Sequence, residues 1–310
     1  MTSSPFQILS LDGGGLKGMF SAAVLAEMET LLKTDVASHF DLISGTSTGG
    51  LIALALGAGC SPAEIVDIYT ELGAMVFGRP RRLRRIFRPK HGAEGLRSAL
   101  DRIFGERLLR DSKRCLLIPS YSLIGADVYI FKTPHHSRFY RDGNERMVDV
   151  AMATTAAPTY FPAAQLRNNR LIDGGVWANN PALVAIAEAH STFEVDLADI
   201  RMLSLGTTTE TTAPDRRFFS GGLAAWARPS GLDVFLRAQA FGGFHTAEHL
   251  LRLDKGRLVR IDAAVPRHYF RLDRLDESKI RGLAEHVARI ECPHVAPLMT
   301  HTAPPPVFYN

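Results

Sequence analysis

Cysteine is scarce in this 310-residue sequence, and neither sign of charge dominates it. Its three cysteines, Cys60, Cys115 and Cys292, are widely spaced and form no CxxC pair. This sparse, odd count excludes a disulfide framework, indicates free thiols in a reducing compartment and gives no sign of a zinc site. The 36 basic and 32 acidic residues leave a net charge of only +4, which does not single out a nucleic-acid polymer as a partner.

No targeting or membrane-spanning segment is expected either. The residues from Met1 to Phe6 show no basic stretch followed by an apolar one, so no signal peptide is expected. The uncharged run from Leu42 to Ala63 is about as long as a membrane span, but its centre, from Ser44 to Gly50, is rich in glycine and hydroxyl groups. Such a centre favours a turn between a strand and a buried helix. We therefore expect a soluble, cytoplasmic protein that acts peripherally at a membrane.

The spacing of apolar residues predicts an α/β fold. A strand over 7–11, a helix over 19–32, a strand over 39–44 and a helix over 51–59 form a βαβ unit, which implies a parallel sheet. Further helices are expected over 62–75, 147–157, 181–190, 232–253 and 277–290, and further strands over 115–121, 127–131, 171–172, 201–205 and 258–262. Because no linker or internal repeat divides the chain, we predict one α/β domain with appended C-terminal helices.

A GxSxG pentapeptide, Gly45-Thr46-Ser47-Thr48-Gly49, lies where the second strand turns into a helix. Small residues at both ends of this motif permit a strained turn that presents the serine hydroxyl at the N-terminus of the helix. Ser47 is therefore predicted to be a nucleophile. The alternative is a tight turn in which Ser47 only caps the helix.

The turn after the first strand, Gly13-Gly14-Gly15-Leu16-Lys17-Gly18, also satisfies the dinucleotide-binding pattern GxGxxG. That function needs an acidic residue at the far end of the second strand, whereas Asp41 lies at its near end. Since adjacent parallel strands bring both turns to one edge, we expect the amides of Gly13, Gly14 and Gly15 to form an oxyanion hole facing Ser47. Lys17 would add positive potential at its mouth. A phosphate-accepting turn without catalysis and a merely solvated Lys17 are the alternatives.

A serine nucleophile needs a base, and none of the eleven histidines follows a recognisable strand-end glycine turn. Asp173 does occupy such a position, in Leu171-Ile172-Asp173-Gly174-Gly175. A carboxylate at the C-terminal edge of the sheet, beside Ser47, can accept the hydroxyl proton directly. The alternative is an Asx-turn residue, which would be the better interpretation if Asp173 stood alone.

Together these motifs resemble the patatin-like phospholipase family. The three that carry the resemblance are 12–18, 45–49 and 173–175, in that order, and the segments 156–162, 179–181 and 203–207 are also similar. The resemblance covers Phe6 to Thr208. Motif support comes from Lys17, Gly18, Gly45, Gly49, Gly174 and Gly175. One departure is mild: many members have alanine at the position of Gly175.

The resemblance implies a three-layer α/β/α sandwich with a mainly parallel sheet. The catalytic core would span 6–208, with helical elements over 209–310 packed on the same domain. Ser47 and Asp173 would form a catalytic dyad, Gly13 to Gly15 the oxyanion hole, and the substrate would be the acyl esters of membrane phospholipids, cleaved without a metal or cofactor. A Ser–His–Asp esterase is disfavoured because Ser47 follows only the second strand. A non-catalytic lipid- or nucleotide-binding module is disfavoured because both Ser47 and Asp173 are present.

A basic run from Arg79 to Lys90 has seven basic residues among twelve and no acidic ones. Such a segment suits anionic headgroups, although a solvated loop is an equally simple interpretation. The residues predicted to contact a membrane or an activator are Arg81, Arg82, Arg84 and Arg85. The stretch from Ala153 to Pro162 and the compact length resemble bacterial patatin-like effectors that cyclic dinucleotides activate in anti-phage defence. A cyclic-dinucleotide activator and a homo-oligomer are therefore further expectations.

Overall fold

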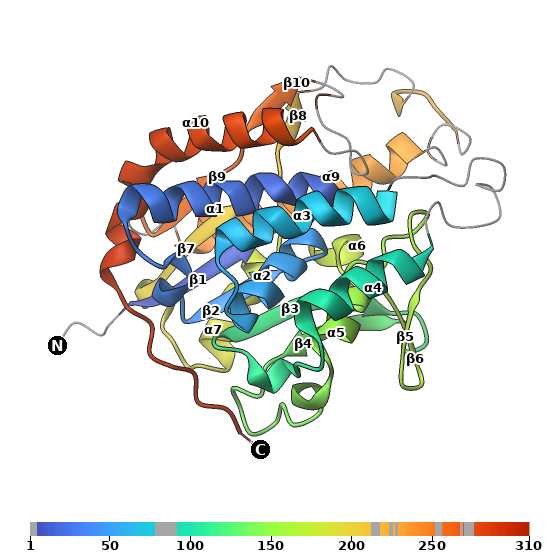
Figure 1. The fold of residues 1–310 in the computed structure, drawn as a ribbon, viewed down its shortest axis with the longest axis horizontal. Helices are drawn as coiled ribbons and strands as arrows, with labels where there is room; N and C mark the ends of the chain where they lie inside the picture. The colour runs from blue at the N-terminus through green and yellow to red at the C-terminus, as the bar shows by residue number, and fades with distance from the viewer. Residues whose placement is uncertain are drawn as a thin grey trace.

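The computed structural model describes residues 5–77, 92–211, 218–222, 226, 229–251, 256–266, 269 and 276–309. At their centre lies an eight-stranded sheet with the order β5-β6-β3-β2-β1-β7-β9, in which β4 pairs with β3 (Figure 1). The strands are β1 (Phe6–Leu11), β2 (Leu42–Gly45), β3 (Cys115–Ser122), β4 (Asp127–Lys132), β5 (Ala164–Leu166), β6 (Asn169–Asp173), β7 (Ile200–Leu205) and β9 (Leu258–Ile261). The basic run, with Arg81, Arg82, Arg84 and Arg85, lies outside the described residues.

The middle of the sheet is parallel, as the βαβ pattern predicts. β3, β2, β1, β7 and β9 all run in one direction, whereas β6 and β4 run antiparallel to β3. The register pairs Leu11 at the end of β1 with Gly45 at the end of β2. The turns that follow these two strands therefore leave the same edge of the sheet at the same level.

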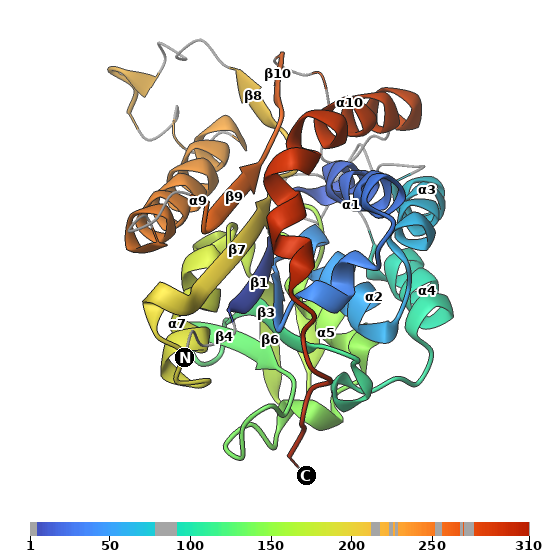
Figure 2. The same cartoon turned by 90° about the vertical axis from the view of Figure 1, so that its left-hand side faces the viewer.

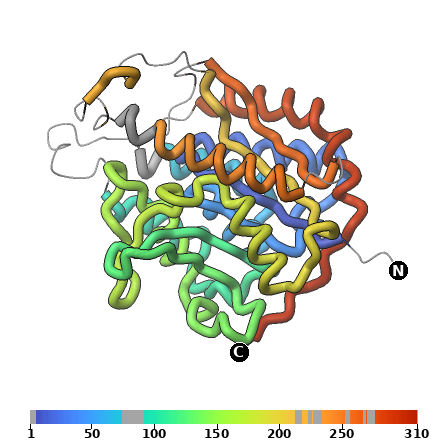
Figure 3. Tube along the Cα trace, turned by 180° about the vertical axis from the view of Figure 1, so that it is seen from behind, coloured from blue at the N-terminus to red at the C-terminus, as the bar shows by residue number. Residues whose placement is uncertain are grey.

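Helices cover both faces of this sheet. They are α1 (Gly18–Leu32), α2 (Thr48–Ala58), α3 (Pro62–Phe77), α4 (Ala93–Phe104), α5 (Met147–Thr154), α6 (Gly175–Ala178), α7 (Ala182–Ser191), α9 (Pro229–Leu251) and α10 (Glu277–Val295). Figure 2 shows α1 to α4 and α10 on one side of the strands and α7 and α9 on the other. Seen from behind, α9 and α7 lie in front of the sheet (Figure 3). No helix among the described residues combines the length and apolarity that crossing a bilayer requires.

Alternating strand residues supply the two cores. Leu9 and Ile43 belong to the larger core under α1 to α5 and α10, whereas Ile8 and Leu42 belong to the smaller core under α7 and α9. This alternation follows from the two-residue period of a strand, and it makes the sheet the middle layer of three. The predicted three-layer α/β/α architecture is therefore confirmed.

The last third of the chain is built into these layers. β9 pairs with β7 at the edge of the sheet, as the short strand expected over 258–262 implies, and α10 packs on α1 with Ile280, Ala284 and Ala288 fully or almost fully buried. A second, two-stranded sheet joins β8 (Thr209–Thr211) to β10 (Ala264–Pro266).

Two expected boundaries differ for identifiable reasons. The second strand begins at Leu42, not at His39, because His39 ends a 3-10 turn and the Asp41 carboxylate accepts a hydrogen bond from the Gln7 amide at 2.7 Å. The helix expected over 51–59 begins at Thr48, directly after the serine of the GxSxG motif. The elements α4, α6 and β5 are not among those that the apolar pattern predicts.

Candidate active site

The turn from β2 to α2 holds Ser47 in a strained backbone conformation, with φ 55° and ψ −119°. A Cβ atom on Gly45 would lie 2.1 Å from the carbonyl oxygen of Gly49, and one on Gly49 would lie 2.2 Å from that of Leu11. Neither position has room for a side chain. The spacing of glycines in the GxSxG motif is thus a packing requirement of a turn that puts Ser47 at the N-terminus of α2.

Two buried threonines hold this turn in place. The Ser47 amide donates to Thr154 Oγ1 at 2.9 Å, and that hydroxyl donates in turn to the carbonyl of Pro119 at 2.7 Å. Thr46 Oγ1 donates to the carbonyl of Ala178 at 2.6 Å. Surrounding contacts of this kind are what keep a strained residue in its conformation. Sequence reasoning missed Thr154, because a threonine near the end of a helix of small residues carries no distinctive signal.

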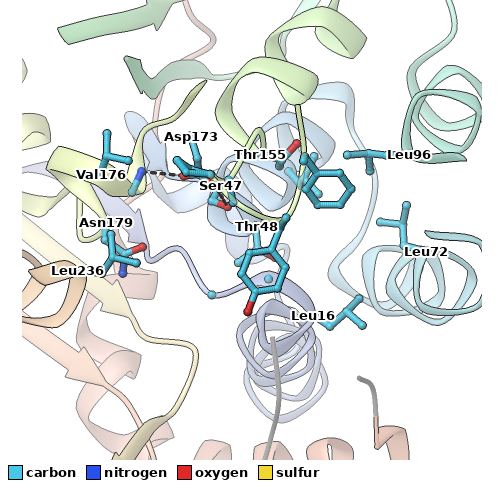
Figure 4. Close-up of a pocket in the computed structure, with 18 of the residues that line it drawn as sticks. Leu16, Ser47, Thr48, Leu72, Leu96, Thr155, Asp173, Val176, Asn179 and Leu236 are labelled. Atoms are coloured by element: carbon cyan, nitrogen blue, oxygen red, sulfur yellow. Dashed lines mark hydrogen bonds between the residues drawn. The ribbon is translucent and has the colours of Figure 1, made fainter. Parts of the chain in front are cut away.

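Asp173 meets Ser47 directly. The Ser47 hydroxyl donates to Asp173 Oδ2 at 2.5 Å, and the amide of Gly175 donates to Oδ1 at 2.7 Å (Figure 4). Asp173 is the last residue of β6, which runs antiparallel to β3, and it pairs with Ser120. Since β2 pairs Ser44 with Leu117, Asp173 lies three residues further along β3, which is the level of Ser47.

Burial sets the protonation behaviour of this carboxyl group. Asp173 is 5% exposed, and this burial raises its pKa to about 6, against the opposing hydrogen bonds from Ser47 and Gly175. A carboxyl group with such a pKa is mostly ionised at pH 7 and still basic enough to take a proton. The pair therefore has both the geometry and the pKa of a nucleophile with its general base.

The glycine turn after β1 lies beside this pair. Gly14 and Gly15 line the same cavity as Ser47 and Asp173, and they begin the 3-10 turn Gly15–Lys17 that leads into α1. Amides at such a position have no partner within their own helix and favour negative charge. A Cβ atom on Gly14 would lie 2.0 Å from Thr207 Oγ1, so this close packing requires glycine.

One expectation about this turn needs correction, and another stays a prediction. The amide of Gly13 donates to the carbonyl of Asn179 at 2.9 Å, so it is not available to an oxyanion as the sequence predicts. Lys17 Nζ donates to the carbonyl of Thr208 at 3.3 Å, Lys17 is not among the described residues that line the cavity, and its contribution of positive potential stays a prediction. Gly14 and Gly15, in contrast, line the cavity, and their amides stay the predicted oxyanion donors of this turn.

The other motif glycines have packing reasons of their own. A Cβ atom on Gly18 would lie 2.1 Å from Thr48 Oγ1, where α1 passes close to α2, and one on Gly174 would lie 2.3 Å from the carbonyl of Pro119. On Gly175 it would lie 3.0 Å from Asp173 Oδ1. Because Asn179 Oδ1 would be equally close, an alanine at this position requires small displacements of both the Asp173 carboxylate and the Asn179 side chain.

The site opens into an apolar cavity of about 160 Å³. Leu72 and Leu96 lie on one side of the Ser47–Asp173 pair, and Asn179 and Leu236 lie on the other (Figure 4). Further apolar lining comes from Leu16, Leu51, Tyr69, Phe161 and Val176. Among the described residues, no histidine lines the cavity, which argues against a Ser–His–Asp triad. No group of three or more metal-ligating side chains is present in the described part of the chain.

Comparisons with known proteins identify the relatives of this chain. A sequence model described as patatin-like phospholipase matches residues 9–186. A cGAMP-activated phospholipase of Pseudomonas aeruginosa (strain BWHPSA011 / Pa011) is similar, with 35% identity over 100% of this chain and 97% of that protein. Another, from Vibrio cholerae serotype O1, is 31% identical over 90% of this chain and 88% of that protein. The crystal structure of VipD from Legionella pneumophila has a similar fold, with a TM-score of 0.51 at 11% identity over 96% of this chain and 67% of that one.

These matches bear out the family that the three ordered motifs predict. The fold class is confirmed by the parallel sheet between its helical layers and by the likeness to VipD. The expected class of enzyme, a lipid hydrolase, is confirmed by the family match and by the relatives that share it. The chain belongs to the patatin-like phospholipase family.

Proposed function

We propose that this protein hydrolyses acyl esters of membrane phospholipids, with Ser47 as nucleophile and Asp173 as general base. The observation that carries the proposal is the 2.5 Å hydrogen bond from the Ser47 hydroxyl to Asp173 Oδ2 at the polar end of an apolar cavity. The amides of Gly14 and Gly15 serve as the oxyanion hole.

In the first half of the reaction, Ser47 Oγ bonds to the ester carbonyl carbon while its proton passes to Asp173 Oδ2. The carbonyl oxygen becomes an oxyanion that the amides of Gly14 and Gly15 stabilise. Collapse of this intermediate breaks the bond to the glycerol oxygen, which takes the proton from Asp173 as the lysophospholipid leaves. An acyl-serine remains.

In the second half, Asp173 takes a proton from water as the water oxygen attacks the acyl-serine. The tetrahedral intermediate uses the same two amides, and its collapse returns the proton to Ser47 Oγ and releases the fatty acid. Both halves need one base beside one hydroxyl group, which is what the Ser47–Asp173 pair supplies.

The cavity supports an acyl chain as the part of the substrate that is enclosed. Asp173 is the only charged side chain among the described residues that line it, so it offers no cation to a phosphate group. A cavity of about 150 Å³ encloses about six carbon atoms, as benzene binding in a comparable engineered cavity indicates. We therefore place the first carbons of the acyl chain inside and the headgroup at the membrane surface.

Regulation by a cyclic dinucleotide is the second part of the proposal. Two relatives that match most of this chain are named cGAMP-activated phospholipases. We propose that cGAMP activates this protein too, in an anti-phage role, and that the protein acts peripherally at the membrane. Contact with the membrane or the activator is assigned to Arg81, Arg82, Arg84 and Arg85, with a homo-oligomer as the active state.

A single set of assays tests the proposal. Fatty-acid release from phosphatidylglycerol vesicles is measured by mass spectrometry with and without cGAMP, for the wild type, for Ser47→Ala and for the surface control Ser38→Ala. We expect release by the wild type and by Ser38→Ala only, and labelling by a fluorophosphonate probe that Ser47→Ala abolishes. Release by Ser47→Ala equal to that of the wild type would refute the nucleophile, and lipid binding without any release would favour a binding module.

A further inference from the structure

The turn that carries the oxyanion donors is tied to an arginine from the last third of the chain. Arg260 lies on β9, at the edge of the sheet, and outside the residues 9–186 that the family model matches. Its guanidinium donates two hydrogen bonds to the Asp12 carboxylate, from Nη1 to Oδ1 at 3.1 Å and from Nη2 to Oδ2 at 2.7 Å. Asp12 is the residue that precedes Gly13, so this contact is made at the base of the glycine turn.

This ion pair is largely removed from solvent. The side chain of Asp12 is 8% exposed and that of Arg260 is 20% exposed. Phe244 of α9 lies against the guanidinium, whose Cζ atom is 5.1 Å from the ring centroid. A buried, bidentate arginine–carboxylate contact fixes orientation as well as charge. Arg260 is thus held between the Phe244 ring and the Asp12 carboxylate.

Neutral groups complete the surroundings of Asp12. Asn180 Nδ2, from the segment before α7, donates to Asp12 Oδ1 at 2.8 Å, and Ser204 Oγ on β7 accepts from Arg260 Nη1 at 2.8 Å. The other charged group that faces Asp12 is Asp262, whose Oδ2 lies 3.2 Å from Arg260 Nη2. The Arg260 guanidinium therefore forms ion pairs with both Asp12 and Asp262, and its removal would leave two neighbouring carboxylates without this positive charge.

Gly13, which lies between Asp12 and the predicted oxyanion donors, is also held by hydrogen bonds. The carbonyl of Gly13 accepts from Thr207 Oγ1 at 3.1 Å, and the amide of Gly13 donates to Asn179, the neighbour of Asn180. Hydrogen bonds therefore hold the turn at Asp12 and Gly13, and the next two residues, Gly14 and Gly15, line the cavity. Only Gly13 separates Asp12 from the cavity-lining Gly14 along the chain.

We propose that Arg260 is a positioning residue for catalysis, which aligns the Gly14–Gly15 amides with Ser47 and neutralises Asp12 where negative charge develops on the substrate. The proposal rests on the ester-hydrolase function proposed above. It makes the last third of the chain part of the catalytic apparatus. Arg260 does not line the cavity, so it acts through the turn and not on the substrate.

The test compares variants of Arg260 on a soluble ester, p-nitrophenyl butyrate, with cGAMP present. We expect Arg260→Gln to lower kcat by about 100-fold, the loss that a misplaced catalytic group or a lost oxyanion donor typically causes. KM should change by less than about twofold, because the cavity is untouched. Arg260→Lys keeps the charge and should recover part of the loss.

The pH profile distinguishes positioning from a general structural role. Burial raises the pKa of Asp12 to about 6, with Arg260 opposing the rise, so removal of the arginine raises this pKa further. In Arg260→Gln, kcat should therefore fall as the pH rises above about 7, where an unpaired Asp12 becomes ionised. The double variant Asp12→Asn/Arg260→Gln lacks that charge and should lose this alkaline decline and regain about tenfold in kcat.

Arg257 provides the matched control. It lies just before β9, is 2% exposed and donates from Nη1 to the carbonyl of Leu197 at 2.7 Å. Arg257→Gln should lower the unfolding midpoint, because it removes a buried side chain and its hydrogen bond to Leu197. It should leave kcat within about twofold of the wild-type value. An equal kcat loss in Arg257→Gln and Arg260→Gln would overturn the proposal, as would a loss that neither pH nor Asp12→Asn alters.

Comparison with Ser47→Ala separates the positioning role of Arg260 from the hydrolase function itself. A wild type that is faster than Ser47→Ala, together with an Arg260→Gln variant equal to the wild type, overturns the positioning role alone. A wild type no faster than Ser47→Ala overturns the hydrolase function and the positioning role together.

Discussion

The Asp173→Asn variant would remove a buried charge while it keeps the size and shape of the side chain. In the wild type, Oδ1 accepts from the Gly175 amide and Oδ2 from the Ser47 hydroxyl. The amide oxygen of asparagine can replace Oδ1, but an NH₂ group then takes the place of Oδ2 and donates to Ser47 instead of accepting. Because loss of a general base lowers rates by about 10²–10⁴-fold, kcat on p-nitrophenyl butyrate should fall at least about 100-fold.

The same substitution should stabilise the fold near neutral pH. Burial raises the pKa of Asp173 from 3.8 to about 6, so the folded state holds this proton more tightly than the unfolded state. Once ionised, the carboxylate costs the folded state free energy, and a pKa difference of about 2 corresponds to about 3 kcal/mol. This cost develops between about pH 4 and pH 6. Asp173→Asn should therefore raise the free energy of unfolding by up to about 3 kcal/mol at pH 8, and by less as the pH falls toward 4.

Urea unfolding between pH 5 and pH 8, followed by circular dichroism, measures the stability change alongside the kinetics. Asp142→Asn is the matched control, because burial also raises the pKa of Asp142, whose carboxylate accepts from Tyr129 away from the cavity. This control should also gain stability and keep its kcat. Wild-type kcat in Asp173→Asn would refute the general base, and a lower stability than wild type at pH 8 would refute the burial argument.

Three further predictions concern pH, chain length and the membrane. For p-nitrophenyl butyrate, kcat/KM should rise around pH 6 and then level off, since ionised Asp173 is the active form; a fall between pH 5 and pH 7 would contradict this. Leu72 lines both the catalytic cavity and a smaller apolar one, so Leu72→Ala should shift the preferred p-nitrophenyl ester by about two carbons or more toward longer chains and cost about 2–5 kcal/mol of stability. An unchanged chain-length profile would mean that the acyl chain lies elsewhere. Glutamine at four arginines should lower hydrolysis of anionic vesicles at least about tenfold and that of p-nitrophenyl butyrate less than about threefold, whereas equal losses would argue for a structural role. These four are Arg81, Arg82, Arg84 and Arg85.

The parts of the site that the sequence predicts are those that local chemistry fixes. A strained turn at Ser47 leaves no room for side chains at Gly45 and Gly49, so the motif carries its own structural explanation. The apolar spacing of the first 60 residues likewise requires a parallel βαβ unit, which puts the turns after β1 and β2 at one edge. Three such turns in order are enough to predict both the family and the Ser47–Asp173 pair.

The parts that it does not predict depend on pairing between distant segments. The antiparallel direction of β6 beside β3 depends on pairing between Ser120–Ser122 and Leu171–Asp173, which lie far apart in the chain. The use of the Gly13 amide by Asn179 depends on a contact across 166 positions of the chain, and Arg260 reaches Asp12 across 248. Hydrogen bonds of this range come from tertiary packing, and motif spacing contains no information about them.

The residues between Asp173 and Asn180 connect all three parts of the site. The segment supplies the base itself, its Ala178 carbonyl accepts from Thr46 beside the nucleophile, and its Asn179 carbonyl accepts from Gly13 in the oxyanion turn. The distances among nucleophile, base and oxyanion donors thus depend on where this one short segment lies. Its position is fixed partly from α9, where Gln239 Oε1 accepts from the Asn179 amide at 2.8 Å and where Leu236 lines the cavity. The catalytic geometry of this chain therefore depends on a helix beyond the motifs, which explains why those motifs identify the chemistry without determining the site.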